Sequence, residues 1–240
     1  MTLLVARRVG EGVVLASDSR ELRGEQGERT SRSTRKIYEA RPGFLFAWAG
    51  YTNVHQAFIL ELQRRQGLSP ALDRLGIERH LDDSVAAIRD RGVTDYGEFF
   101  LAWWSPIERK TIARRFTTGG TGEYVEDWGE AGDREPIQIA RVIHGTLAYI
   151  PAAALTVEQA KILTLKVVRD SIAIGGESIG GAVQLGAVGA DGVSVAGAPE
   201  LRVLHDTLDL WEAQSAELLP GGVQVPVDSP TPDRGLRPPG

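Results

Sequence analysis

The sequence predicts an α+β fold in which antiparallel sheets are covered by helices. Groups of short apolar strands are separated along the chain by segments with helical periodicity. Tight turns such as Gly10-Glu11-Gly12 and Pro42-Gly43 join the strands within a group. Because tight turns connect antiparallel neighbours, whereas parallel strands need long crossovers, these turns argue against a doubly wound parallel sheet.

The first fifty residues predict four strands and one polar loop. The strand segments are rich in aliphatic and β-branched residues, which favour a pleated, half-buried surface. The loop, at about 19–33, is rich in Arg, Glu and Gly. The expected strands are 2–9, 13–18, 34–41 and 44–49.

Helical periodicity replaces the strand pattern after Gly50. In the next segment, for example, Val54, Phe58 and Leu62 recur every four residues and predict an amphipathic helix. Further along, Thr156 and the glutamine three residues later have the spacing of a capping box. The expected helices are 52–66, 78–91, 155–173 and part of 200–219, and the remaining expected strands are 97–104, 110–117, 182–188 and 193–196.

The chain is expected to form one domain over residues 1–219, followed by a tail over 220–240. Its 240 residues suffice for a single two-layer core. The tail is dense in Pro and Gly, a composition that predicts disorder.

Composition and charge exclude several classes of function. The net charge of −5 and the lack of a basic stripe argue against a nucleic-acid partner. The chain has no cysteine, which excludes a disulfide framework and a thiolate site, and its four histidines lack metal-binding spacing. We therefore expect no metal and no cofactor. The start of the chain lacks a signal-peptide pattern and no apolar run reaches the ~20 residues of a membrane span, so we expect a cytoplasmic protein.

An apolar strand that begins at the second residue points to the chemistry. Thr2 follows Met1 and is small enough for a methionine aminopeptidase to expose it. An amino-terminal threonine carries both a hydroxyl nucleophile and an amine that can act as its general base. A nearby cation, a carboxylate that holds the cation, and a backbone N–H for the oxyanion would complete a hydrolytic site.

Three residues can supply these additional groups. Asp18 ends the strand that is expected to pair with the first one. Lys36 is expected on the following strand, and Gly50 ends the fourth strand before a helix. Each residue taken alone is also explained by an ordinary turn or a solvated charge.

Taken together, these segments resemble the amino-terminal signature of proteasome β-type subunits, which are N-terminal-nucleophile (Ntn) hydrolases. The resemblance is carried by residues 2–5, 12–20, 35–37 and 47–50. A second patch, Asp170-Ser171 with residues 178–183, resembles the segment that carries the supporting serine of the family. The pattern is closer to the bacterial branch called Anbu than to the archetypal β subunit, and HslV is the next nearest.

The resemblance implies a four-layer αββα sandwich that assembles into a homo-oligomeric ring or open ring. It implies a threonine peptidase that acts on peptides or unfolded proteins, with an ATPase unfoldase as a candidate partner. Position by position, it makes Thr2 the nucleophile with its own amine as the base, and it makes Lys36 the cation that lowers the pKa at Thr2. Asp18 would orient Lys36, the Gly50 N–H would donate to the oxyanion, and Ser178 would contact the Thr2 amine.

Some positions depart from the family pattern. The second aspartate of the family has no clear match, and Asp170 and Glu177 are the candidates. Thr121 is the candidate for the serine of a Gly-Ser-Gly motif, and Ala47 replaces a usual glycine. Two alternatives stay open: an Ntn amidase that is not a peptidase, and a catalytically inactive structural ring subunit.

Overall fold

The computed structural model describes residues 2–23, 30–120, 122–147, 150–175 and 179–218. The expected tail at 220–240 lies outside these residues. Within them, helices and antiparallel sheets alternate along the chain, which confirms the α+β class. No helix in the described part of the chain has the length and apolar character needed to cross a membrane.

The first sheet contains the start of the chain in its interior. Its strand order is β10-β1-β2-β11-β12, and all neighbours are antiparallel. Strand β1 therefore has a partner on each side, which fixes the position of the residue that precedes it. The bounds are β1 Leu3–Val9, β2 Gly12–Ser17, β10 Trp128–Gly132, β11 Gln184–Gly189 and β12 Gly192–Val195.

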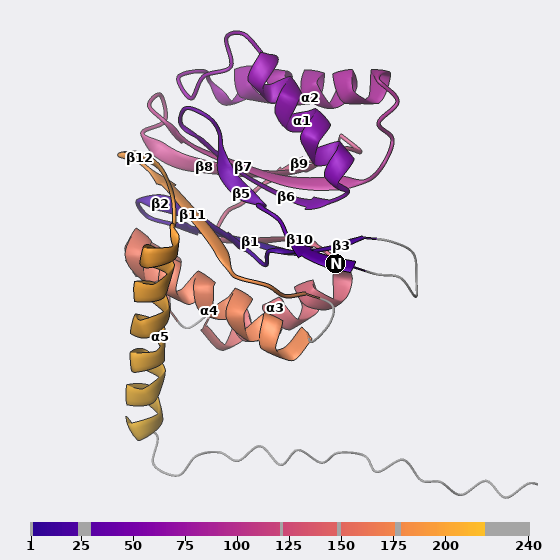
Figure 1. The fold of residues 1–240 in the computed structure, drawn as a ribbon. Helices are drawn as coiled ribbons and strands as arrows, with labels where there is room; N and C mark the ends of the chain where they lie inside the picture. The colour runs from indigo at the N-terminus through magenta and orange to yellow at the C-terminus, as the bar shows by residue number, and fades with distance from the viewer. Residues whose placement is uncertain (1, 24–29, 121, 148–149, 176–178, 219–240) are drawn as a thin grey trace, which may run out of the picture.

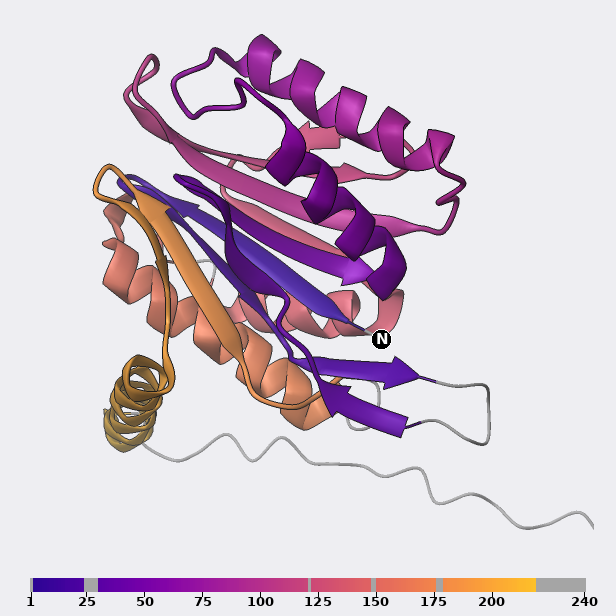
Figure 2. The same cartoon turned by 45° about the horizontal axis from the view of Figure 1, so that its top comes forward.

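The second sheet has the order β5-β6-β7-β8-β9 and is also antiparallel throughout. A separate two-stranded ribbon, β3 with β4, projects from the edge of the molecule close to the N-terminus (Figure 2). The bounds are β3 Arg20–Arg23, β4 Thr30–Ser33, β5 Ile37–Arg41, β6 Phe44–Gly50, β7 Gly97–Ser105, β8 Lys110–Thr117 and β9 Gly122–Tyr124.

Helices cover the outer faces of the two facing sheets (Figure 1). Helices α1 and α2 lie over the second sheet, α3 and α4 lie over the first, and α5 packs beside α4 and extends beyond it. The bounds are α1 Thr52–Arg64, α2 Arg74–Asp90, α3 Arg134–Leu147, η1 Ala152–Ala154, α4 Val157–Gly175 and α5 Ala198–Leu218.

The alternation of side chains along β1 explains why this strand is buried on both faces. Leu3 and Val5 point into a cluster shared with α3 and α4. Leu4 points the other way, into a cluster between the sheets that also contains Leu45 and Phe100. A strand packed on both sides holds its first residues in a fixed position, which matters for the site described below.

Most expected elements are present, and two expectations were wrong. The expected loop at 19–33 contains the β3–β4 ribbon, and the expected strand at 34–41 begins only at Ile37. No element was expected between 118 and 154, where β9, β10, α3 and η1 lie. The capping box is confirmed, since the Gln159 backbone N–H donates to the Thr156 hydroxyl and the Thr156 backbone N–H donates to the side-chain amide oxygen of Gln159.

Candidate active site

Thr2 lies directly before β1 and is buried, with 7% of its surface exposed. Its hydroxyl oxygen accepts a hydrogen bond from the Lys36 ammonium at 3.0 Å. The fold brings these two residues together although 34 positions separate them in the sequence. An ammonium at this distance stabilises negative charge that develops on the hydroxyl oxygen.

Lys36 is almost fully buried, and all three of its N–H donors have acceptors. Besides Thr2, the Nζ atom donates to an Asp18 carboxylate oxygen at 2.9 Å and to the Arg20 carbonyl at 2.8 Å. The Lys36 backbone N–H donates to the side-chain oxygen of Gln184 on β11 at 2.7 Å. The side chain is thus held at both ends, and the expected position of Lys36 on a strand is corrected to the connection just before β5.

Burial lowers the pKa of Lys36 from its usual value, and the neighbouring Asp18 carboxylate opposes this effect. The buried ion pair keeps a cation beside Thr2 that gives up its proton more readily than a surface lysine. Both the ammonium and its partner are removed from water, so the pair tolerates the loss of neither member.

Asp18 follows β2 and is fully buried. Its two carboxylate oxygens accept hydrogen bonds from the backbone N–H groups of Leu3, Arg20 and Gly180, in addition to the bond from Lys36. Backbone donors on three segments of the chain therefore fix this carboxylate, and its contact with the Lys36 ammonium agrees with the orienting role that the resemblance implies.

Asp133 is a site residue that the sequence did not reveal. It lies immediately before α3, and its carboxylate accepts a hydrogen bond from the Thr2 backbone nitrogen at 2.6 Å. The Asp133 backbone N–H also donates to the Thr2 carbonyl at 3.0 Å. One residue thus holds both polar backbone groups of Thr2.

A helix-start pattern in the sequence could have found this residue. Asp133 is a preferred helix N-cap type, and Glu135 and Pro136 follow in the first turn of the helix. The buried residues of α3 then recur at helical spacing: Pro136, Ala140, Ile143 and Leu147. The pattern predicts the helix, but contact with Thr2 depends on β10, which pairs with β1 and ends at Gly132.

Gly132 allows this close approach. Its φ is +120°, and a Cβ atom there would overlap the carbonyl oxygen of Thr2. We expect Gly132→Ala to destabilise the fold by about 2 kcal/mol or more and to displace Asp133 from Thr2. Thermal unfolding measures the effect.

Gly145 on α3 is the matched control for that substitution. Among the described residues, a Cβ there would meet no atom within 4 Å other than those of its chain neighbours and of the backbone of α3. Gly145→Ala should stabilise the helix by up to about 1 kcal/mol, because alanine has the higher helix propensity. Equal unfolding temperatures for the two variants would contradict the assigned role of Gly132.

Gly50 lines the same pocket as Thr2 and Lys36. The pocket has a volume of about 270 Å³ and is also lined by Arg20, Glu21, Trp48, Tyr51, Tyr96 and Asp133. Gly50 has a φ of +105°, and a Cβ atom there would lie 2.7 Å from the Tyr96 carbonyl oxygen. Only glycine fits this turn without strain.

Of the four other candidate residues, the structure describes only Asp170. Ser178, Glu177 and Thr121 lie outside the described residues. Asp170, on α4, forms ion pairs with Lys166 at 2.6 Å and with Arg169 at 3.3 Å. Both oxygens of the Asp170 carboxylate thus have partners on α4, whereas the carboxylate that contacts Thr2 is that of Asp133.

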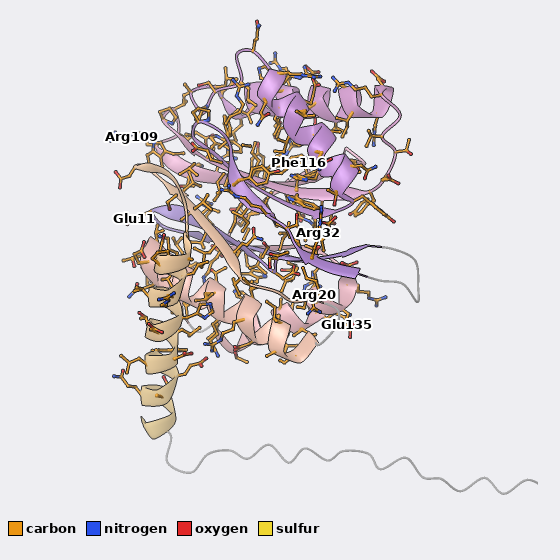
Figure 3. The ribbon with its side chains drawn as sticks, in the orientation of Figure 1. Glu11, Arg20, Arg32, Arg109, Phe116 and Glu135 are labelled. Carbon is orange, nitrogen blue, oxygen red and sulfur yellow. The ribbon has the colours of Figure 1, made fainter. Side chains whose placement is uncertain are left out.

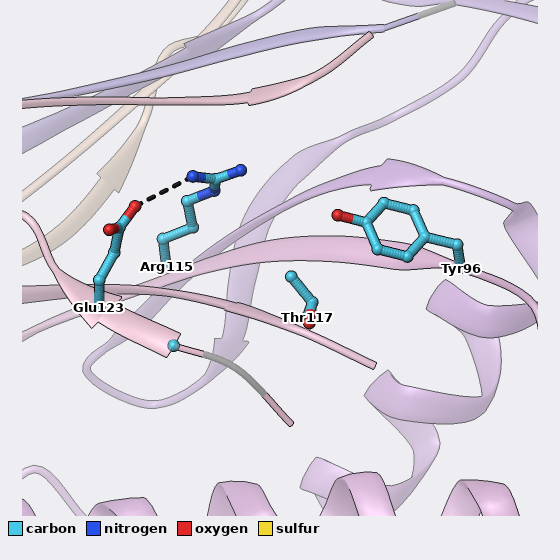
Figure 4. Close-up of a pocket in the computed structure, with 5 residues that line it drawn as sticks. Tyr96, Arg115, Thr117 and Glu123 are labelled. Carbon is cyan, nitrogen blue, oxygen red and sulfur yellow. Dashed lines mark hydrogen bonds and ion pairs between the residues drawn. The ribbon is translucent and has the colours of Figure 1, made fainter. Parts of the chain in front are cut away.

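The pocket opens at the end of the molecule where the chain starts. Figure 3 places Arg20, Arg32 and Glu135 at this end, and Glu11 and Arg109 at the opposite end. Next to the pocket lies a second hollow of about 250 Å³, which shares Tyr96 with it. Arg115 and Glu123 line this hollow and form an ion pair at 3.0 Å (Figure 4).

Two solved structures of Anbu from Hyphomicrobium sp. strain MC1 are similar to this one. The first, of a Gly-1 mutant, has a TM-score of 0.69 and 18% sequence identity, over 91% of this chain and 97% of that one. The second has a TM-score of 0.68 and 16% identity, over 92% of this chain and 99% of that one. The chain has the fold of Anbu.

The Anbu fold confirms the structural side of the resemblance seen in the sequence. No family model matches the sequence, and no curated protein matches it. Among the described residues, no group of His, Cys, Asp and Glu side chains could hold a metal ion.

Proposed function

We propose that this protein is a threonine-type peptidase of the Ntn-hydrolase class, with Thr2 as the nucleophile after removal of Met1. The observation that carries the proposal is the hydrogen bond from the buried Lys36 ammonium to the Thr2 hydroxyl, with Asp18 behind it. A cation that is buried, paired and aimed at a hydroxyl oxygen is costly to maintain and is typical of an activated nucleophile.

The reaction follows from the positions of these groups. The Thr2 nitrogen, an amide while Met1 is attached, would become a free amine that takes the hydroxyl proton as Oγ1 attacks the peptide carbonyl carbon. Gly50 N–H would donate to the resulting oxyanion. Collapse breaks the C–N bond, and the Thr2 ammonium returns the proton to the leaving amine. Water then hydrolyses the ester, with the same amine as base.

The wider architecture and assembly are parts of the same proposal. We infer that the two sheets and their covering helices form the four-layer αββα sandwich of Ntn hydrolases, in one domain over residues 1–219. We also propose a cytoplasmic homo-oligomer, a ring or open ring, that receives peptides or unfolded proteins. An ATPase unfoldase is the proposed partner.

An assay of peptides beside small amides tests the proposal. Fluorogenic peptides should be hydrolysed, and a peptide epoxyketone, which reacts with an adjacent hydroxyl and amine, should block the hydrolysis. Turnover of small amides alone would indicate an amidase. Turnover of neither, with Met1 removed and the protein folded, would indicate an inactive ring subunit and refute the proposal.

A further inference from the structure

We propose that Asp133 holds the proton on the Thr2 amine, so that this site works best in alkaline solution. The inference rests on the proposed function, because it concerns the base in that reaction. It goes further by assigning a role to a residue outside the nucleophile–lysine–aspartate set, and it predicts a measurable pH dependence.

The contact itself is direct. The Asp133 carboxylate lies 2.6 Å from the Thr2 nitrogen, while Lys36 reaches the hydroxyl oxygen of the same residue at 3.0 Å. The two charged groups therefore act on different atoms of Thr2. The carboxylate stabilises the protonated amine, and the ammonium stabilises the deprotonated hydroxyl.

The segment that carries Asp133 is held by a buried acid. The Gly132 N–H donates to the Glu98 carboxylate at 2.5 Å, and Glu98 is 4% exposed. Glu98 also accepts hydrogen bonds from the Tyr96 hydroxyl at 2.5 Å and from the Arg115 guanidinium at 2.8 Å. Since the backbone at Gly132 is fixed in this way, Asp133 stays within reach of Thr2.

The balance of charge around the amine favours protonation. Lys36 is the cation that contacts the Thr2 hydroxyl, and its charge is compensated by Asp18 at 2.9 Å. Asp133 then adds a further negative charge next to the nitrogen. The other titratable side chains that line the pocket are those of Arg20, Glu21, Tyr51 and Tyr96. Glu21 forms an ion pair with Arg32 at 2.8 Å, so its charge is largely compensated.

The direction of the pH effect follows from the chemistry of the base. An α-amine has an ordinary pKa of about 8, and a carboxylate within hydrogen-bond distance raises it. A protonated amine cannot accept the hydroxyl proton, so the rate increases with pH until the amine is neutral. Removing the negative charge of Asp133 should therefore extend activity to lower pH.

A purely structural role for Asp133 must be separated from this electrostatic one. Asp133 precedes α3, and aspartate at such a position also stabilises the start of a helix. Asparagine and serine serve equally well there, but neither carries a charge. The variants Asp133→Asn and Asp133→Ser thus keep the helix start and remove only the carboxylate charge.

The test compares kcat/KM of the wild type and the two variants from about pH 6 to pH 10. In both variants we expect the acid limb of the profile to move to lower pH by about 1–2 units. At a pH below the wild-type limb, each variant should then keep a fraction of its own maximal kcat/KM that is about 10- to 100-fold larger than the fraction the wild type keeps. An unshifted profile, or a loss of the same factor at every pH, would overturn the proposal.

A second measurement does not depend on hydrolysis. Nitrogen NMR of threonine-labelled mature protein follows the titration of the Thr2 amine directly. We expect the amine to titrate at higher pH in the wild type than in Asp133→Asn; equal titration would overturn the proposal even if peptides are cleaved. If the titration differs but no peptide is cleaved at any pH, Asp133 has the inferred effect and the proposed function alone fails.

Discussion

Replacement of Thr2 by alanine is expected to reduce peptide hydrolysis at least about 10³-fold, to the level of the uncatalysed background. The substitution removes Oγ1, the atom that would attack the carbonyl carbon and that accepts a hydrogen bond from Lys36. No other hydroxyl in the pocket has a buried ammonium as its partner among the described residues. Initial rates with a fluorogenic peptide measure the effect.

Thr2→Ser is the matched control, since it keeps the hydroxyl and permits removal of Met1. It should retain measurable hydrolysis. The alanine variant should lose only about 1 kcal/mol of stability, the usual value of one hydrogen bond, because alanine still fills the buried position. Wild-type hydrolysis by Thr2→Ala would exclude Thr2 as the nucleophile.

Replacement of Lys36 by methionine is expected to lower kcat on the order of 10²-fold or more. Methionine has a similar length and apolar stem, but it offers no charge to the Thr2 oxygen during attack. It also leaves Asp18, which is fully buried, without its ion-pair partner. That loss should cost about 3–5 kcal/mol of stability.

The rate must therefore be measured on folded protein, below the unfolding temperature of the variant. Lys166→Met provides the control. Lys166 on α4 is also paired with a carboxylate, Asp170, at 2.6 Å, but it does not line the pocket. Its variant should keep the wild-type kcat. A folded Lys36→Met protein with unchanged kcat would contradict the role given to the lysine.

The alkaline side of the pH profile should report on the same lysine. Burial lowers the pKa of Lys36 below the ordinary value of a lysine, and the Asp18 carboxylate opposes this effect. Activity requires the protonated form, so kcat should fall as pH rises, and this fall should begin at lower pH than the ordinary pKa of a lysine would give. Together with the acid limb assigned to the Thr2 amine, this predicts a bell-shaped profile.

Much of the site could be predicted because its residues lie at the ends of strongly patterned strands. Asp18 and Gly50 follow β2 and end β6, where apolar runs give clear boundaries. Thr2 and Lys36 lie next to such boundaries as well. The roles of these residues stay predictions, but their proximity in the pocket agrees with them.

Other features depend on long-range contacts that leave little trace in the local sequence. Asp133 reaches Thr2 only because β10 pairs with β1 across more than a hundred residues. The β3–β4 ribbon is polar, and its sequence therefore resembles a loop. Gln184, which holds the Lys36 backbone, is an unremarkable strand residue until the sheets are packed together.

The role of Thr2 as the amino-terminal nucleophile is tested most directly by tandem mass spectrometry of the protein after treatment with a peptide β-lactone. We expect the amino-terminal peptide to begin at Thr2 and to carry the inhibitor as an ester on the threonine side chain. Asp133→Asn should be labelled at the same residue. An amino-terminal peptide that still begins with Met1, or an inhibitor bound to a different residue, would contradict the proposal that Thr2 is the nucleophile.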